Sequence, residues 1–261
     1  MSFPLTPSFL LAVALVVAVA GTVNGVAGFG FAVVGTMALA TLLDPATAVV
    51  FMIVPILAAN LSLVDELSGA ELRSCGRRFA PLLVAATVGT LLGMVLLDRL
   101  PEAPLRLGLG VVTLAFVAVS QRVVPIALPS SVTEPRFAES PGWMAAIGGV
   151  SGVLFGATNV GVQIVAYVRS RDLSHGVFVG VVALVFLGVN GVRVVAAGAL
   201  GLYSGVTVAA VSVAAAVPAA AGVAVGKRLR PRLGACRRRG LVFGLLTVIG
   251  VRLVLGGLGI V

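Results

Sequence analysis

The chain has 261 residues, of which 59% are hydrophobic and 10% are charged, and its formal net charge is +9. A mean hydropathy of +1.18 excludes a soluble globular domain and indicates a polytopic membrane protein. The excess of cations does not indicate a nucleic-acid partner, because the Lys and Arg residues stand in loops beside apolar segments, where they orient a membrane protein.

Eight apolar segments joined by short loops are expected. They span residues 8–43, 46–64, 79–97, 105–120, 142–168, 176–199, 205–226 and 240–259. As one helix, the first segment would be about 54 Å long, against a hydrocarbon core of about 30 Å. It must therefore break, and the stretch Asn24-Gly25-Val26-Ala27-Gly28-Phe29-Gly30 supplies glycines for the break. Asp44-Pro45 then ends this segment.

The fifth segment, 142–168, is interrupted in its middle by Gly156-Ala157-Thr158-Asn159-Val160-Gly161. It is too short for two full spans of about 20 residues each. A single crossing would place the cations of 227–239 opposite those of 65–78, against the positive-inside rule, so the segment is expected to turn back as a re-entrant hairpin. Broken backbone at membrane depth must line a cavity or be buried in protein, which makes the break a candidate binding site.

The basic loops predict the orientation of the chain in the cell membrane. Loops at 65–78, 121–141, 169–175 and 227–239 hold 14 of the 18 Lys and Arg residues. We assign this face to the cytoplasm, where it is also expected to attract anionic lipid. The C-terminus is then outside, and the N-terminus is expected outside too, from length and from symmetry with the second half.

The two halves of the chain are similar. Asn24-Gly25 and Ser151-Gly152 are 127 residues apart, and each pair opens a glycine-interrupted stretch. A short turn containing Asp44 or Asp172 follows, and then a segment with Asn60 or Asn190 late in its length. If each hairpin counts as two passes, each half makes five, and an odd number inverts the second copy relative to the first.

The predicted fold is therefore all-α, with two inverted repeats, each a glycine-broken re-entrant hairpin followed by three transmembrane helices. The first repeat would occupy 1–120, a cytoplasmic linker 121–141 and the second repeat 142–261. Inverted repeats with discontinuous helices that meet near the midplane are a common plan among transporters.

The distribution of charge favours an anionic substrate. All nine carboxylates fall in loops or at segment edges, whereas a cation transporter or a proton relay normally needs acidic groups at depth. Arg193 and Arg252 lie inside apolar segments, and a bound anion would offset the insertion cost of an arginine, about 2.5–3.5 kcal/mol. In the alternative interpretation, Arg193 snorkels to the outer interface and Arg252 bonds to backbone carbonyls.

The candidate substrate site combines the two breaks with the two arginines. Half-helix N-termini offer unpaired N–H groups and partial positive charge, and glycine lets the backbone approach a ligand. Alternatively, the polar side chains satisfy the broken backbone or hold neighbouring helices together. The expected substrate-binding residues are Asn24, Gly28, Gly30, Asn60, Ser151, Gly156, Thr158, Asn159, Gln163, Asn190, Arg193 and Arg252.

No enzyme, metal site or cofactor is expected. The only histidine, His175, lies in a loop, and no His/Cys cluster, nucleophile–base pair or Walker motif is present. The alternatives to a transporter are an anion channel, because broken helices also line pores, and a non-transporting assembly subunit. Trp143, Tyr167 and Tyr203 fall near segment ends and are expected to be interfacial anchors.

These features resemble the sulfite exporter TauE/SafE family of membrane transporters. The matching stretches are Asn24-Gly25-Val26-Ala27-Gly28-Phe29-Gly30-Phe31, Gly148-Gly149-Val150-Ser151-Gly152-Val153-Leu154-Phe155-Gly156 and Phe186-Leu187-Gly188-Val189-Asn190-Gly191-Val192-Arg193. The breaks here read Gly-Phe-Gly and Gly-Ala-Thr-Asn, where family members often carry a fuller glycine cluster or Gly-Pro-Pro. The resemblance implies an exporter of small sulfur-containing or organic anions, such as sulfite or sulfoacetate, that works by alternating access around two broken helices.

Overall fold

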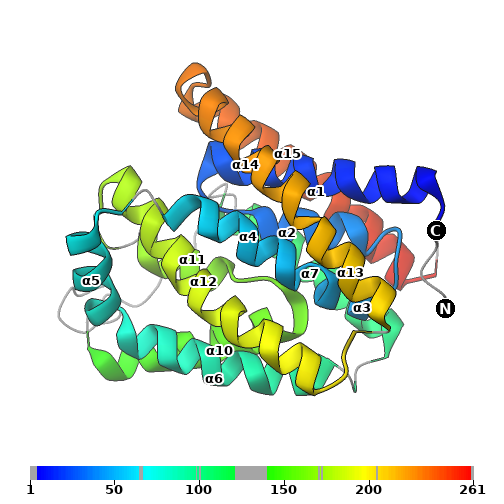
Figure 1. The fold of residues 1–261 in the computed structure, drawn as a ribbon, viewed down its shortest axis with the longest axis horizontal. Helices are drawn as coiled ribbons and strands as arrows, with labels where there is room; N and C mark the ends of the chain where they lie inside the picture. The colour runs from blue at the N-terminus through cyan, green and yellow to red at the C-terminus, as the bar shows by residue number, and fades with distance from the viewer. Residues whose placement is uncertain are drawn as a thin grey trace.

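The computed structural model describes residues 5–64, 67–97, 99, 101–120, 140–169, 171, 173–203 and 205–259, and the regular structure in these ranges is entirely helical (Figure 1). The helices are α1 (Pro7–Ala27), α2 (Phe31–Leu39), α3 (Pro45–Phe51), α4 (Ile53–Val64), α5 (Gly69–Arg78), α6 (Ala80–Leu97), α7 (Glu102–Ser120), α10 (Pro141–Thr158), α11 (Val162–Arg169), α12 (His175–Ala199), α13 (Val206–Ala214), α14 (Ala216–Leu229), the 3-10 turn η1 (Arg230–Arg232) and α15 (Ala235–Gly257). Most of the predicted linker, and Asp172, lie outside the described residues.

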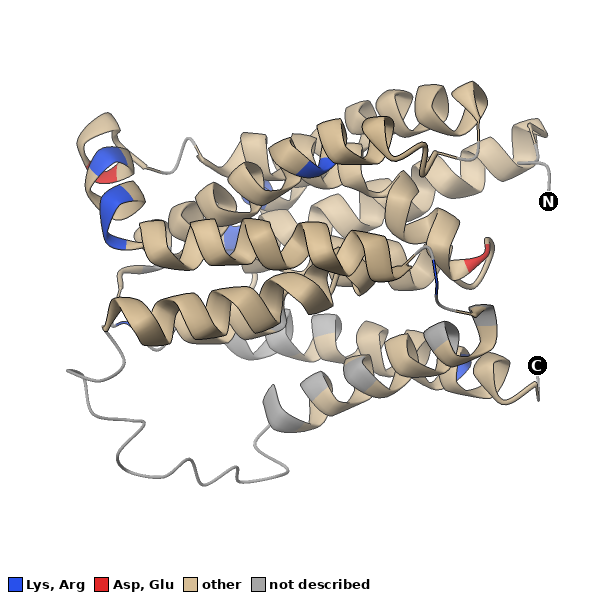
Figure 2. Ribbon diagram, turned by 90° about the horizontal axis from the view of Figure 1, so that it is seen from below, with Lys and Arg blue, Asp and Glu red and all other residues tan. Residues whose placement is uncertain are grey.

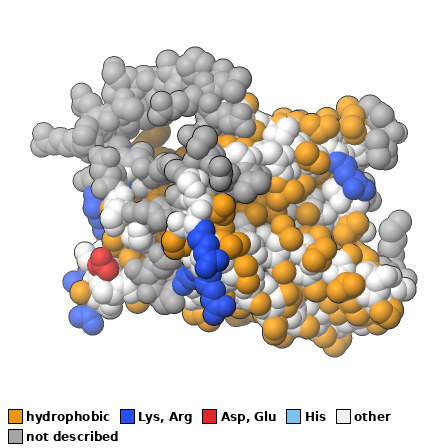
Figure 3. All heavy atoms as spheres, turned by 90° about the horizontal axis from the view of Figure 1, so that it is seen from above, with side chains coloured by type: hydrophobic (Ala, Val, Ile, Leu, Met, Phe, Trp, Pro, Cys, Tyr) orange, Lys and Arg blue, Asp and Glu red, His pale blue; other side chains and the backbone are white. Residues whose placement is uncertain are grey.

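Among the described residues, five helical stretches are long and apolar enough to cross a membrane. They are Pro7–Ala27, Pro45–Val64, Ala80–Leu97, Gly176–Ala199 and Val206–Arg232, and Phe243–Gly257 is a shorter apolar stretch. Hydrophobic side chains cover much of the surface beside the cations in Figure 3, as expected of a surface that faces lipid. The protein is a multi-pass membrane protein.

Both expected interruptions of the apolar segments are present. The first segment divides between α1 and α2, where Gly28 and Gly30 have φ of 81° and 104°. The fifth divides between α10 and α11, where Asn159 has φ of 58°. These left-handed conformations end one helix and redirect the chain into the next, which is why glycine or asparagine stands there.

The apolar segment at 46–64 is bent rather than straight. It forms α3 and α4, which are separated at Met52. Pro55 explains the bend, because it lacks the N–H that would bond to the carbonyl of Phe51. The Ser212 hydroxyl on α13 donates to that carbonyl instead, at 2.5 Å.

The basic loop at 65–78 contains a helix, α5, that hydropathy did not predict. Ser68 and Glu71 form its capping box: the Ser68 side chain accepts from the Glu71 N–H, and the Glu71 carboxylate accepts from the Ser68 N–H. The helix lies at one end of the molecule, whereas the start of α1 and the end of α15 lie at the other (Figure 1). Cations of α5 mark that end in Figure 2.

Glycines bring two pairs of helices into backbone contact, α1 with α14 and α10 with α6. A Cβ added to Gly25 would lie 2.8 Å from the Cα of Gly226, and one added to Gly156 would lie 3.0 Å from the Cα of Gly93. Such close approach is typical of small-residue packing between membrane helices. Each pair joins a helix that precedes a break to a helix of the other half of the chain.

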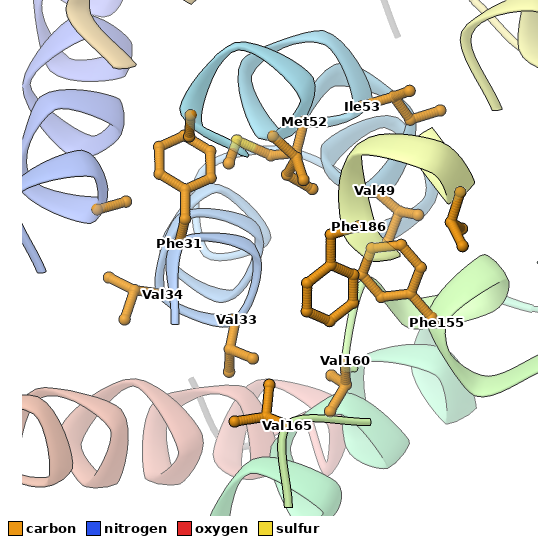
Figure 4. Packing of buried hydrophobic residues seen from close by; sticks show 14 of the residues in the cluster. Phe31, Val33, Val34, Val49, Met52, Ile53, Phe155, Val160, Val165 and Phe186 are labelled. Carbon is orange, nitrogen blue, oxygen red and sulfur yellow. The ribbon is translucent and has the colours of Figure 1, made fainter. Parts of the chain in front are cut away.

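The hydrophobic core lies around the two breaks. Figure 4 shows residues of α2, such as Phe31, opposite Met52 and Ile53, with Phe155 and Phe186 in contact nearby. The ring centroids of Phe155 and Phe186 are 4.9 Å apart. Both halves of the chain therefore contribute to one core, and the polar residues of the breaks lie inside it.

Candidate functional site

Arg193 on α12 is the largest fully buried side chain among the described residues, with 1% of its surface exposed. The other buried polar residues described are Asn, Ser and Thr, so no described carboxylate is buried with it. The alternative in which Arg193 snorkels to the outer interface is wrong, because its side chain points into the protein. A cation enclosed without an acidic partner is the main electrostatic feature of this structure.

The Arg193 guanidinium is held by neutral oxygen atoms. Nη1 donates to Oδ1 of Asn159 at 2.7 Å and to Oδ1 of Asn190 at 3.2 Å. Nη2 donates to the carbonyl of Gly156 at 3.4 Å. These contacts orient the group and stabilise its charge through dipoles, and they leave the net positive charge of the site intact.

Aromatic side chains form a wall of the site. The Arg193 guanidinium carbon lies 4.9 Å from the ring centroid of Phe155, a cation–π contact. Phe155 in turn packs against Phe186, one turn before Asn190 on α12. The positive charge thus lies between amide oxygens and aromatic surface, where the low dielectric strengthens its attraction for an anion.

Asn159 joins the second break to the first half of the chain. Its Oδ1 accepts from Arg193, and its Nδ2 donates to Oγ1 of Thr36 and to the carbonyl of Val49, both at 2.9 Å. Thr36 was not among the expected site residues, and it is the only hydroxyl or amide side chain in α2. One amide therefore connects α10, α12, α2 and α3, and all of its hydrogen-bonding groups are used.

The first break has its own arginine contact. Nε of Arg230, in η1, donates to the carbonyl of Gly25 at 2.9 Å. Asn24 spans the break, since its Oδ1 accepts from the N–H of Phe31 at 3.4 Å. Gly28 lies against the side chain of Val179, so a larger residue there would clash.

The other expected site residues have local contacts. Asn60 and Asn190 each donate to the carbonyl one turn earlier, both at 2.8 Å, and the Thr158 hydroxyl donates to Leu154 at 2.5 Å. Ser151 is buried on α10, and Oε1 of Gln163 is buried without a hydrogen-bond partner. Gly30 is the N-cap residue of α2.

Arg252 is exposed on α15 and does not join the cluster around Arg193. Tyr167 is buried, with 6% of its surface exposed, so its prediction as an interfacial anchor is wrong. Within the described residues no group of three or more His, Cys, Asp and Glu side chains could hold a metal ion. The structure therefore brings Gly156, Asn159, Asn190 and Arg193 together with Thr36 and leaves Arg252 outside.

Two broken helices and a buried cation fit the family resemblance seen in the sequence. Comparison with protein-family models identifies the family. The model described as Sulfite exporter TauE/SafE matches residues 13–253. The chain belongs to the sulfite exporter TauE/SafE family. No curated protein and no solved structure matches the chain.

Membership of the TauE/SafE family confirms the resemblance and makes the protein a membrane transporter. The matched region contains both breaks and every residue of the Arg193 cluster. The family is one of transporters for sulfite-type anions, and an enclosed positive charge is chemically suited to such substrates.

Proposed function

We propose that this protein is a secondary transporter that exports a small sulfur-containing or organic anion, such as sulfite or sulfoacetate, and that Arg193 binds the anion. The observation that carries the proposal is the fully buried guanidinium with no described carboxylate buried beside it. An arginine at membrane depth costs about 2.5–3.5 kcal/mol on insertion scales. A bound anion offsets that cost, and no cofactor is needed for this role.

The hydrogen-bonding pattern of the cluster supports the assignment. Asn159 and Asn190 offer Arg193 only amide oxygens, and the Nε atom of Arg193 is buried without a hydrogen-bond partner. Asn159 and Asn190 hold the arginine in place, and the Nε side of the guanidinium remains available to an oxyanion. Gly156 contributes its carbonyl to the orientation of the arginine rather than to the anion.

Two inverted repeats would place the breaks opposite each other, and the glycine contacts support this arrangement. Gly226 of α14 meets the Thr22 carbonyl of α1, and Gly93 of α6 meets the Val153 carbonyl of α10. Thr22 and Val153 are 131 residues apart, as are the break residues Gly28 and Asn159. The same contact thus occurs twice with the two halves exchanged, as a two-fold relation requires.

Contacts at the α5 end support a re-entrant second hairpin. α10 runs parallel to α6, because Gly148, Gly152 and Gly156 meet successive turns of α6. α6 follows α5 directly, so α10 starts at the α5 end. Gly180, near the start of α12, meets Leu67 at that same end. These contacts support a chain that leaves and returns to one side between Pro141 and His175, and we assign that side to the cytoplasm with its basic loops and anionic lipid.

The bonds between the halves of the chain support alternating access. Thr36 and Val49 of the first half are bonded to Asn159, and Asn159 is bonded to Arg193. If one half rocks against the other, these bonds must break or move with the arginine, which would expose the anion to one side at a time. The position of the cluster between the halves supports this mechanism over a fixed pore.

A matched pair of arginine variants tests the proposal. Arg193→Gln removes the enclosed charge, and Arg252→Gln makes the same change on the exposed face of α15. In proteoliposomes, we expect Arg193→Gln to lower sulfite flux at least about tenfold, the equivalent of one charged hydrogen bond. Arg252→Gln should retain wild-type flux, and equal flux from all three proteins would rule out Arg193 as the anion site.

A further inference from the structure

Tyr203 is folded back beside α12 by the turn that ends this helix. Gly201 has φ of 64°, the Leu202 N–H donates to the Ala197 carbonyl at 3.0 Å, and the Gly201 N–H donates to the Gly198 carbonyl at 3.2 Å. This is a Schellman motif, which reverses the chain after a helix. Because of this turn, Tyr203 packs against the hydrophobic core. The sequence had predicted that Tyr203 would be an interfacial anchor.

Tyr203 and Arg193 each have a buried polar atom without a hydrogen-bond partner. These atoms are the hydroxyl oxygen of Tyr203 and Nε of Arg193. A buried hydroxyl normally finds a partner, because an unmade hydrogen bond costs the full desolvation of the group. Two such donors at one end of α12 point to a ligand that accepts from both.

The turn brings the chain back toward Arg193, because Leu202 is bonded to Ala197, one helical turn beyond Arg193 on α12. Burial raises the pKa of the Tyr203 hydroxyl, and the positive charge of Arg193 acts in the opposite direction. The hydroxyl is therefore kept protonated, as a donor, near the guanidinium. A protonated phenol beside a cation can donate to an anion that the cation attracts.

We propose that Tyr203 is a further substrate-binding residue and that its O–H and the Nε–H of Arg193 donate to two oxygens of the same oxyanion. This inference rests on the proposed function, and it narrows the substrate from small anions in general to anions with two acceptor oxygens. An anion with at least two acceptor oxygens on one atom, a carboxylate or a sulfur oxyanion, can accept from both donors. A halide offers a single acceptor centre and is expected to bind more weakly.

The test is Tyr203→Phe, which removes only the hydroxyl, with Tyr167→Phe as the matched control. Sulfite flux and melting temperature are measured for both variants, with Arg193→Gln alongside. Tyr203→Phe should raise the KM for sulfite about tenfold, with little change in kcat, because one hydrogen bond to a charged ligand is lost. It should also reduce the rise in melting temperature that sulfite causes, whereas chloride at the same concentration should cause little rise in any variant.

A structural role of the hydroxyl gives a different result. Because the hydroxyl has no partner in the protein, Tyr203→Phe should not lower the melting temperature measured without anion. A lower anion-free melting temperature, or a KM equal to that of Tyr167→Phe, would overturn the role of Tyr203. If Arg193→Gln still abolishes flux, the anion site at Arg193 stands without Tyr203. If Arg193→Gln has no effect, both inferences fail.

Discussion

At the scale of single residues, the site depends on the choice of amide over carboxylate beside Arg193. Asparagine at 159 and at 190 provides oxygen acceptors without charge. An acidic residue in either place would form an internal ion pair, and the protein would then have no unpaired charge to offer a substrate. The neutral acceptors therefore keep a cation buried while leaving it attractive to anions.

The first prediction concerns Asn159→Asp. The new carboxylate would lie where Oδ1 now accepts from Arg193 at 2.7 Å, so it would neutralise the guanidinium. We expect the purified variant to remain folded and to lose sulfite-induced stabilisation, measured as the shift in melting temperature.

Asn159→Gly is the control for this change. Glycine tolerates the φ of 58° at this position and adds no charge, although the bonds to Thr36 and Val49 are lost. We expect Asn159→Gly to be less stable than the wild type and to keep the rise in melting temperature that sulfite causes. If sulfite shifts the melting temperatures of Asn159→Asp and Asn159→Gly equally, the charge of the new carboxylate has no effect on sulfite binding, and the explanation by neutralisation of Arg193 is wrong.

Most residues of the Arg193 cluster could be predicted from the sequence, but not all of them. Gly156, Asn159, Asn190 and Arg193 stood out because polar or flexible residues are rare in apolar segments. Arg252 stood out for the same reason and lies elsewhere, because a helix that is apolar all round does not reveal which side faces lipid. Thr36 was missed, since a lone threonine in a helix carries no such signal.

At the scale of helices, the contact between α10 and α6 depends on the absence of side chains. Gly156 faces the backbone of Thr90 and Gly93, whereas a Cβ added to Gly149 on the same helix would point into open space. Alanine should therefore destabilise the protein at position 156 but not at position 149.

Gly156→Ala should lower the free energy of unfolding by about 1–3 kcal/mol, as overpacking does, and move the break away from Arg193. Gly149→Ala should be neutral or stabilising by up to about 1 kcal/mol, because alanine favours the helix. Thermal unfolding in detergent compares them. A melting temperature for Gly156→Ala equal to that of Gly149→Ala would contradict the close packing.

Hydropathy predicted the apolar helices well and the polar one poorly. α5 was missed because its ten residues are largely polar, although Ser68 and Glu71 stood at capping-box spacing in the sequence. Pro55 was equally visible, yet a proline in an apolar run does not by itself say whether a membrane helix bends or ends.

At the scale of the whole molecule, the proposed repeat has a register that sequence similarity did not identify. Pairing Asn24 with Ser151 gives a separation of 127 residues. In the glycine contacts, the residues on α1 and α10 correspond at 131, as Thr22 and Val153 do, and those on α6 and α14 correspond at 133, as Gly93 and Gly226 do. The separations of 127 and 131 residues differ by four residues, about one helical turn. This difference arises because Gly148, Gly152 and Gly156 repeat every four residues. Such a repeat matches itself equally well after a shift of one turn, and the contacts with α6 and α14 favour the register at 131.

A labelling experiment tests the re-entrant hairpin. Gly142 and Ser174 are exposed at the two ends of the α10–α11 stretch, and Leu200 is exposed at the far end of α12. In a background that lacks Cys75 and Cys236, single cysteines at Gly142 and Ser174 should react with an impermeant thiol reagent from the same side of the membrane. A cysteine at Leu200 should react from the opposite side.

Labelling of Gly142→Cys and Ser174→Cys from opposite sides would show that the segment crosses the membrane once. The two breaks would then not face each other, and the alternating-access mechanism would have to be abandoned, whatever the role of Arg193.

The central claim is that the buried, uncompensated Arg193 binds the transported anion. Calorimetric titration of the purified protein with sulfite measures this most directly, without vesicles or coupling gradients. We predict saturable binding to the wild type and to Arg252→Gln, and no detectable binding to folded Arg193→Gln. Binding of sulfite to Arg193→Gln with the affinity of the wild type would contradict the claim.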